Sequence, residues 1–207
     1  KIIQYIYNQL HEAAPSLNIM LQTYFYSVDA YETITSLPVQ GIGLDFVHGL
    51  DHNLRNIRTF GFPEDKVLGL GIIDGRNIWK ADLNKKKEII DTILELVDTE
   101  NVWIQPSCSL LHVPITTNNE SSIDEMLINV LAFADEKLHE IQLLKNSYES
   151  DSNDLAEVFT NNKRDIQIIN MSPARNKSYV HAAIKNITNQ DFKRNENFEQ
   201  RKEIQKK

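Results

Sequence analysis

The chain has 207 residues, enough for one or two domains with a sizeable hydrophobic core. It is 41% hydrophobic and 25% charged, and no apolar run reaches the roughly 18 residues that a membrane-spanning helix needs, so we expect no membrane insertion. Its 29 acidic residues outnumber its 22 basic ones, and the net charge of -7 would repel a nucleic-acid backbone. The single cysteine, Cys108, excludes an intrachain disulfide and a zinc site with two or more thiolates, and it predicts a reducing, cytoplasmic setting.

Helical and extended patterns alternate through the first part of the chain. Helices are indicated by apolar residues three and four apart, and strands by short apolar runs between turn residues. The predicted elements are, in chain order, a helix from residue 2 to about residue 13, a strand at 18–25, a short helix near 29–36, a strand at 39–46, a helix at 51–60 and a strand at 67–73. Each predicted strand is followed by a predicted helix.

The same alternation continues beyond residue 80. Asp82 is a predicted N-cap for a helix that carries three consecutive lysines, 85–87, on its solvated side. A fourth strand is predicted at 102–105, before Pro106. Ser122 and Glu125 have the spacing of a capping box, which predicts one helix from there to Leu144.

The order of elements predicts an α/β fold with a parallel sheet of about four βα units. In such folds the working side chains collect at the carboxyl ends of the strands. The candidate ligand-facing residues at these positions are Asp45, Asp74, Arg76, Asn77, Ser107, Cys108, Ser109 and His112.

Several chemistries remain open for these residues. Cys108 and His112 could form a nucleophile and base, although no signature of a cysteine hydrolase surrounds them; alternatively they are a buried thiol and a loop-capping imidazole. A metal site from Asp45, Cys108 and His48 would lack further ligands at the end of the first strand. The pairs Gly41/Gly43 and Gly69/Gly71 lie inside strands, so they predict close packing and not a dinucleotide fingerprint.

Two long strings carry a resemblance to a known family. The sequence LGIIDGRNIWKADL at 70–83 and the sequence WIQPSCSLLHVP at 103–114 closely resemble the cobalamin-independent methionine synthases. The shorter strings GLDFV at 43–47 and FADEKLHEI at 133–141 are also similar to that family, so the resemblance covers most of residues 1–145.

The resemblance implies a methyltransferase of methionine biosynthesis that moves a methyl group from 5-methyltetrahydropteroyl-polyglutamate to homocysteine. It implies two (βα)8 TIM-type barrels, with the catalytic zinc and homocysteine held by the carboxyl-terminal barrel. This chain would supply residues 1–145 as the second half of the amino-terminal barrel and a helical interdomain linker at 166–207. Between them, the mostly Ser, Asn, Asp and Glu composition of 146–165 predicts a polar, poorly ordered connector.

The family's two barrels look like duplicates, and this implies a vestigial site in the present chain. Cys108 in the Pro106-to-Leu110 loop would stand at the place of a thiolate ligand, and Asp45 at the place of a glutamate ligand. Arg76 would stand at the place of the catalytic histidine. The resemblance therefore implies no catalytic residue and no metal in this chain.

The leading hypothesis is thus a structural and substrate-assisting fragment that is inactive alone and whose partner is the rest of the parent chain. A second hypothesis is a free-standing βα module that binds a small anionic ligand through Arg76, Asn77 and the 107–109 loop. A third is a scaffold without a ligand. Because a half-barrel leaves two strand edges unpaired, we also expect the isolated chain to self-associate.

Overall fold

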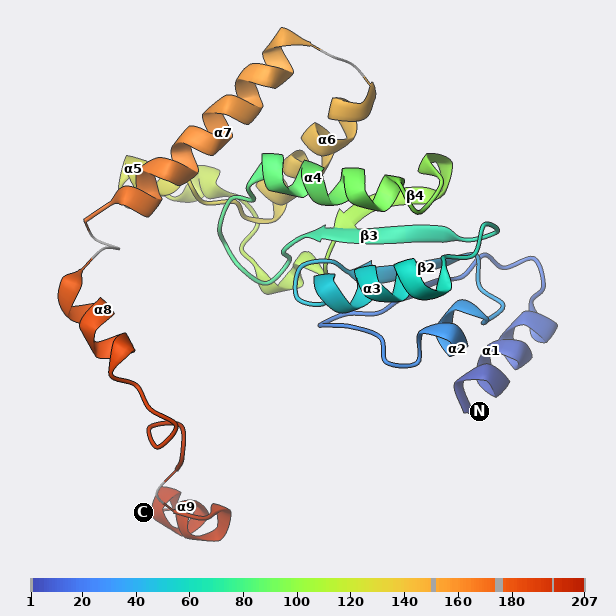
Figure 1. The fold of residues 1–207 in the computed structure, drawn as a ribbon, viewed down its shortest axis with the longest axis horizontal. Helices are drawn as coiled ribbons and strands as arrows, with labels where there is room; N and C mark the ends of the chain where they lie inside the picture. The colour runs from blue at the N-terminus through green and yellow to red at the C-terminus, as the bar shows by residue number, and fades with distance from the viewer. Residues whose placement is uncertain (1, 150–151, 174–176, 195, 207) are drawn as a thin grey trace. The chain divides into compact units, whose positions relative to one another are not determined.

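A computed structural model describes residues 2–149, 152–173, 177–194 and 196–206. The chain forms two compact units, residues 1–166 and residues 167–207. The first unit contains the sheet and most of the core, and the second is helical. Figure 1 shows the ribbon of both units.

The first unit is built around one parallel sheet. Its strands are β1 (Met20–Gln22), β2 (Gly41–Asp45), β3 (Val67–Ile73) and β4 (Val102–Pro106), in the spatial order β1-β2-β3-β4. Every neighbouring pair is parallel. The predicted α/β class and the four predicted strands are confirmed. The first strand is shorter than expected, because the backbone turns away from the sheet at Phe25 and Tyr26, whose φ angles are 62° and 117°.

Helices connect the strands and follow the last one. Those that begin in the first unit are α1 (Ile2–Ala13), α2 (Tyr31–Thr35), α3 (Leu50–Phe60), α4 (Leu83–Leu94), α5 (Glu125–Ile128), α6 (Ala134–Glu149) and α7 (Asn153–Met171). Asp82 caps α4 as predicted, since its carboxylate accepts a hydrogen bond from the Lys85 N–H at 3.3 Å.

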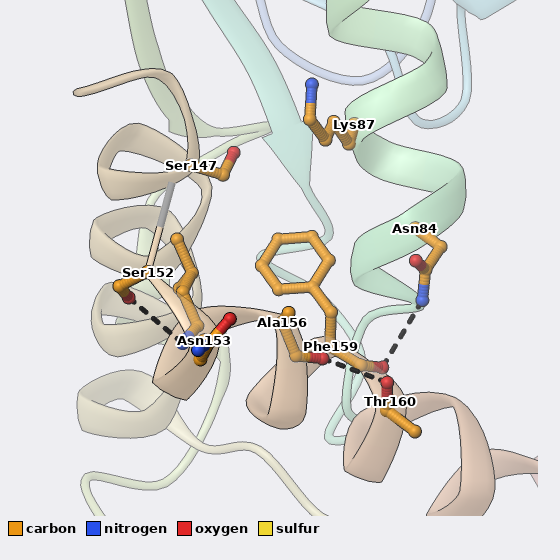
Figure 2. Close-up of a pocket in the computed structure, with 9 residues that line it drawn as sticks. Asn84, Lys87, Ser147, Ser152, Asn153, Ala156, Phe159 and Thr160 are labelled. Carbon is orange, nitrogen blue, oxygen red and sulfur yellow. Dashed lines mark hydrogen bonds between the residues drawn. The ribbon is translucent and has the colours of Figure 1, made fainter. Parts of the chain in front are cut away.

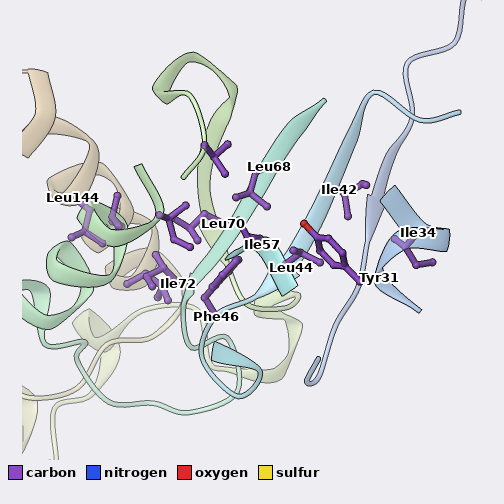
Figure 3. Close-up of a cluster of buried hydrophobic side chains, with 14 of the residues drawn as sticks. Tyr31, Ile34, Ile42, Leu44, Phe46, Ile57, Leu68, Leu70, Ile72 and Leu144 are labelled. Atoms are coloured by element: carbon purple, nitrogen blue, oxygen red, sulfur yellow. The ribbon is translucent and has the colours of Figure 1, made fainter. Parts of the chain in front are cut away.

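The hydrophobic core lies on the helix-covered face of the sheet. Ile42, Leu44 and Phe46 alternate along and just beyond β2, and Leu68, Leu70 and Ile72 do the same along β3. All six are buried and pack with Ile57 of α3 and Leu144 of α6 (Figure 3). Strands β2 and β3 are covered by other parts of the chain, and their sequences are therefore nearly continuous runs of apolar residues and glycine.

The opposite face of the sheet is lined by glycines and two glutamines. Gln22 of β1 and Gln105 of β4 exchange amide hydrogen bonds of 3.2 and 2.8 Å, although two strands lie between them. A Cβ atom at Gly69 would come within 2.8 Å of the Gln105 amide oxygen, so a side chain there would collide with this pair. The predicted close packing of the strand glycines is confirmed, and the sheet curls enough for its outer strands to meet over them.

The prediction of one continuous helix from Ser122 to Leu144 is wrong, because the segment is interrupted. It consists of α5, capped by the Asp124 side chain, and the separate helix α6. Between them the backbone pairs with the loop after β3: the Ala132 N–H donates to the Ile78 carbonyl and the Lys80 N–H to the Val130 carbonyl, both at 2.8 Å. These tertiary hydrogen bonds outweigh the helical propensity of the segment.

The polar connector expected at 146–165 is also corrected. Residues 146–149 complete α6, and α7 covers 153–165; the expectation for residues 150 and 151 lies outside the described residues. Phe159 of α7 belongs to the core, and Asn162 is 6% exposed. The polar composition was misleading because it predicts solvent-exposed side chains, whereas α7 buries the amide of Asn162.

The second unit contains the end of α7 and two short helices, α8 (Ser178–Lys185) and α9 (Phe198–Gln205). Asn197 and Gln200 form a reciprocal capping box at the start of α9. The helical content expected over 166–207 is present in the described part of that range, which omits 174–176, 195 and 207. None of the helices in the described residues combines the length and apolar character that a membrane crossing requires.

Candidate functional site

The candidate residues gather where the parallel strands end. We call residues 23–28 after β1 the β1 turn and residues 74–82 after β3 the β3 loop. The end of β2 joins them: the Asp45 carboxylate accepts from the Tyr26 N–H of the β1 turn, and His48 lies 3.3 Å from Asp45 through Nδ1 and 4.0 Å from Asp74 of the β3 loop through Nε2. The Ser107 hydroxyl beyond β4 accepts a hydrogen bond from the Gly75 N–H at 3.3 Å. The segments after all four strands therefore form one face.

Asp45 is a buried anchor for the β1 turn. Its carboxylate is 1% exposed and accepts hydrogen bonds from the backbone N–H groups of Tyr26 at 3.1 Å, Val47 at 2.8 Å and His48 at 3.0 Å. These donors compensate the buried charge without a metal or a ligand. Asp45 is suited to holding backbone in place.

The β1 turn receives a second anchor from α3. Asn53, which is fully buried, donates to the Asp45 carbonyl at 2.9 Å and accepts from the Val28 N–H at 3.3 Å. A side chain at Gly49 would come within 2.7 Å of the Tyr26 backbone, so the glycine makes room for the turn. Together these contacts hold Phe25 and Tyr26 at positive φ values that such side chains rarely adopt.

Asp74 and Asn77 organise the start of the β3 loop. Asp74 accepts from the Arg76 N–H at 2.8 Å and from the Asn77 amide at 2.6 Å. The Asn77 oxygen accepts from the Trp79 N–H at 3.0 Å and from the Lys137 ammonium at 3.4 Å. Both polar atoms of the Asn77 side chain are thus engaged within the protein.

Arg76 points its guanidinium over the ring of Phe25. The Cζ atom lies 4.8 Å from the ring centroid, and His112 meets the same ring edge-on with centroids 6.0 Å apart. Arg76 is exposed, and within the described residues no carboxylate forms an ion pair with its guanidinium. Sequence analysis selected Arg76 and His112 and missed Phe25. The aromatic triplet at 24–26, placed at the end of a strand, was the available signal.

Ser107, Cys108 and Ser109 form the base of this face. Ser107 and Cys108 are each 3% exposed, and the Ser109 hydroxyl accepts from the Leu111 N–H at 3.3 Å. Burial raises the pKa of the Cys108 thiol, and the charges of Asp74 and Asp45 act in the same direction, whereas the Ser107 hydrogen bond and Arg76 act against it. A thiol with a raised pKa is a poor nucleophile, which disfavours the cysteine–histidine hydrolase.

Charged side chains of α4 and α6 lie beneath the β3 loop, and sequence analysis missed them. Lys137 is fully buried and donates to the Trp79 carbonyl at 3.1 Å. Glu140, 4% exposed, accepts from the Ala81 N–H at 2.7 Å, and burial raises its pKa to about 7. Lys86, which was expected on a solvated helix face, is partly buried, and its pKa is lowered by desolvation. Sequence patterns normally assign such charged side chains to the solvent-exposed surface, so their burial was not predicted.

Helix α7 holds the far end of the β3 loop. Asn162 donates to the Ala81 carbonyl at 2.9 Å and accepts from the Leu83 N–H at 3.1 Å. Lys80 lies 3.5 Å from Asp165 of the same helix. The loop that carries Arg76 is therefore fixed at its carboxyl end by α6 and α7.

The residues of this face do not fit a zinc ion. Asp45 is saturated by backbone donors, and the Cys108 sulfur is 3.7 Å from the Ser109 carbonyl. In the part of the chain that the structure describes, no three histidine, cysteine, aspartate or glutamate side chains are placed to bind one metal. Zinc needs about four donors, at least three of them from protein, so we assign no metal chemistry to these residues.

A separate pocket of about 410 Å³ lies between α4, α6 and α7 (Figure 2). The amide of Asn84 donates to the Phe159 carbonyl at 3.3 Å, and the Thr160 hydroxyl donates to the Ala156 carbonyl at 2.9 Å. Its charged side chain, Lys87, pairs with Asp91 at 3.1 Å. The pocket contains none of the candidate residues, and we regard it as a packing feature between helices.

Comparison with known proteins relates the chain to one family. Residues 1–98 match the model of the N-terminal domain of the cobalamin-independent synthases. The chain is 44% identical over 200 residues to the 5-methyltetrahydropteroyltriglutamate–homocysteine methyltransferase of Bacillus subtilis, covering 97% of this chain and 26% of that protein.

Two further relatives carry the same description. The Lactiplantibacillus plantarum methyltransferase is 43% identical over 196 residues, which is 95% of this chain and 26% of that protein. The Halalkalibacterium halodurans methyltransferase is 44% identical over 204 residues, 99% of this chain and 26% of that protein. The chain spans about a quarter of the length of these curated relatives, and over nearly all of its own length it is similar to this part of the cobalamin-independent methionine synthases.

Proposed function

We propose that this chain is a segment of an enzyme that transfers a methyl group from 5-methyltetrahydropteroyl-polyglutamate to homocysteine to make methionine. The observation that carries the proposal is the 39–44% identity, across nearly all of the chain, to relatives described as methyltransferases acting on these two compounds. Cys108 is a free thiol, which suits a reducing cytoplasm as the place of the reaction.

Within that enzyme, the segment's role is structural and substrate-assisting. Its partner is the remainder of a chain about four times as long, in which the zinc and homocysteine chemistry would reside. The described face supports this division: Asp45 and Asn77 are occupied in holding backbone, and Cys108 is buried with a raised pKa. We therefore propose that the chain alone is catalytically inactive.

We further propose that residues 1–145 form half of a (βα)8 barrel and that residues 166–207 link this domain to the next. The curl of the sheet supports the barrel, because the Gln22–Gln105 amide pair closes over two strands. The helices of the second unit have apolar side chains such as Tyr179 and Phe198 largely exposed, as expected for surfaces that another domain covers.

In the described sheet, β1 and β4 each have one neighbour, so each presents an unpaired edge. Trp103 of β4 is 60% exposed. We propose that isolated chains associate through these edges. Light scattering across a concentration series should show a mass above that of one chain, and a constant monomer mass at high concentration would refute the association.

A chimaera tests the proposed function. The matching quarter of the Bacillus subtilis methyltransferase is replaced by this chain, and methyl transfer to homocysteine is measured with zinc and 5-methyltetrahydropteroyltriglutamate. We expect a folded chimaera with activity, and no turnover above the blank from the chain alone. A folded but inactive chimaera, or turnover by the chain alone, would overturn the proposal.

A further inference from the structure

Two consecutive residues of the β1 turn are held in backbone conformations that cost free energy. Phe25 and Tyr26 have φ angles of 62° and 117°, in a region where residues other than glycine are strained by about 1–3 kcal/mol each. The turn persists because Asp45 and Asn53 hold it from below. Such strain is retained where a side chain must be presented in a particular place, and the side chain presented here is the ring of Phe25.

The ring of Phe25 supports the guanidinium of Arg76. The Cζ atom lies 4.8 Å from the ring centroid, and the imidazole of His112 flanks the same ring. Phe25 is 46% exposed, so the stack lies at the protein surface and is reachable from solvent. This contact engages the face of the guanidinium carbon and leaves its N–H groups available to an oxyanion.

The two aspartates of this face, Asp74 and Asp45, already accept hydrogen bonds from other groups. Asp74 accepts the Arg76 N–H and the Asn77 amide, and Asp45 is buried under three backbone donors. Among the described residues, no carboxylate reaches the guanidinium of Arg76. An arginine that is preorganised, exposed and unpaired is a receptor for a carboxylate or a phosphate group.

We propose that the Arg76–Phe25 stack is a binding subsite for the oxyanion group of a small ligand, either a carboxylate or a phosphate. Arg76 supplies a bidentate donor pair, Phe25 lies beneath the guanidinium, and His112 contacts the edge of the ring. Asn77, Ser107 and Ser109, which sequence analysis grouped with Arg76, hold the surrounding backbone and do not contact the anion. The inference requires only this chain and does not rest on the methyltransferase proposal.

The test is a titration of the purified chain followed by NMR of the arginine Nε–H groups. The probes are sodium phosphate and sodium glutarate at constant ionic strength, with sodium chloride as the reference. We expect the Arg76 signal to shift saturably with at least one of the two oxyanions, and the stronger one identifies the preferred group. Arg58, exposed on α3, is the internal control and should show only the small shift caused by general screening.

Two variants, titrated with the same oxyanions by calorimetry beside the natural chain, distinguish a contribution of the stack from one of charge alone. Arg76→Lys keeps the charge but loses the planar fork, so we expect roughly ten-fold weaker binding. Phe25→Leu keeps an apolar side chain but removes the ring face, and we expect roughly three-fold weaker binding. Arg58→Lys should leave the affinity unchanged. The proposal is overturned if Arg76 shows no saturable shift, if Arg58 shifts equally, or if both variants bind as tightly as the natural chain.

Discussion

The two segments that meet in the Arg76–Phe25 stack are held in place by different parts of the chain. The β1 turn is anchored by Asp45 and Asn53, which follow it by 19 to 27 residues in the next βα unit. The β3 loop is anchored at its far end by Lys137, Glu140 and Asn162, which follow the residues they bind by 58 to 81 positions. The β1 turn is therefore held by residues close to it in sequence, whereas the β3 loop depends on helices that follow the last strand.

This difference means that the two sides of the stack can be loosened separately. Variants beneath the β3 loop should free Trp79 to Leu83 and leave the β1 turn protected from hydrogen exchange. A variant beneath the β1 turn should do the reverse. Each variant below is measured by chemical denaturation and by amide hydrogen exchange, which reports local opening.

The largest effect is expected for Lys137→Met. The variant removes a fully buried ammonium that serves the Trp79 carbonyl and the Asn77 oxygen and that lies near Glu140. We expect the free energy of unfolding to fall by about 3 kcal/mol, because two acceptors lose their donor and the buried Glu140 carboxyl loses a nearby positive charge. Lys145→Met on the same helix removes an exposed pair with Glu149 and should change stability by less than about 0.5 kcal/mol. Equal losses in both variants would contradict the anchoring role of Lys137.

Glu140→Gln should change the pH dependence of stability. Burial raises the pKa of Glu140 to about 7, so the folded chain binds a proton that the unfolded chain releases near pH 4.5. This contribution to stability is present below pH 4.5 and is lost as pH rises through about 7. The stability of the natural chain minus that of the variant should therefore decrease by about 3 kcal/mol between pH 4.5 and 7.5. A difference that stays constant with pH would show that Glu140 is not held in this way.

Asn162→Ala tests the contribution of α7. The variant leaves the Ala81 carbonyl and the Leu83 N–H without their buried partner. We expect a loss of about 2 kcal/mol and faster exchange of the Leu83 amide. The neighbouring Asn161 makes neither of these hydrogen bonds, so Asn161→Ala is the matched control and should change stability by less than about 0.5 kcal/mol. If the two alanine variants behave alike, α7 does not position the β3 loop.

The smallest effect is expected for Asp45→Asn. The amide oxygen can still accept from Val47 and His48, which share one carboxylate oxygen, but the amide NH2 group then faces the Tyr26 N–H, and the charge that strengthens the hydrogen bonds is lost. We expect a loss of about 1 kcal/mol, with faster exchange of the Tyr26 amide and unchanged exchange at Ala81 and Leu83. Equal loosening of both segments would show that the two anchors are not independent.

The elements that could be predicted from the sequence are those with a clear hydrophobic or capping pattern. The run from Val67 to Ile73 could be recognised as a buried strand because every position is apolar or glycine, and Asp82 could be recognised as a cap from its place before Leu83. The break between α5 and α6 could not, because it is created by hydrogen bonds to Ile78 and Lys80, which are distant in sequence.

The sequence predicted that the candidate residues share one face, but not which contacts each of them makes. Parallel strands place their carboxyl ends together, so Asp45, Asp74 and Arg76 could be assigned to one face. Residue type alone does not say which polar side chains already have hydrogen-bond partners within the protein. The Asn77 side chain, for example, is hydrogen-bonded to Asp74 and Lys137. The anchors Lys137, Glu140 and Asn162 were missed because polar residues are normally assigned to the surface.

The most direct test of the central claim is methyl transfer by the chimaera in which this chain replaces the matching quarter of the Bacillus subtilis methyltransferase, measured beside the chain alone. If the chain is a structural and substrate-assisting segment of that enzyme, the folded chimaera methylates homocysteine and the chain alone does not. Methylation by the chain alone, or a folded chimaera without activity, would contradict it.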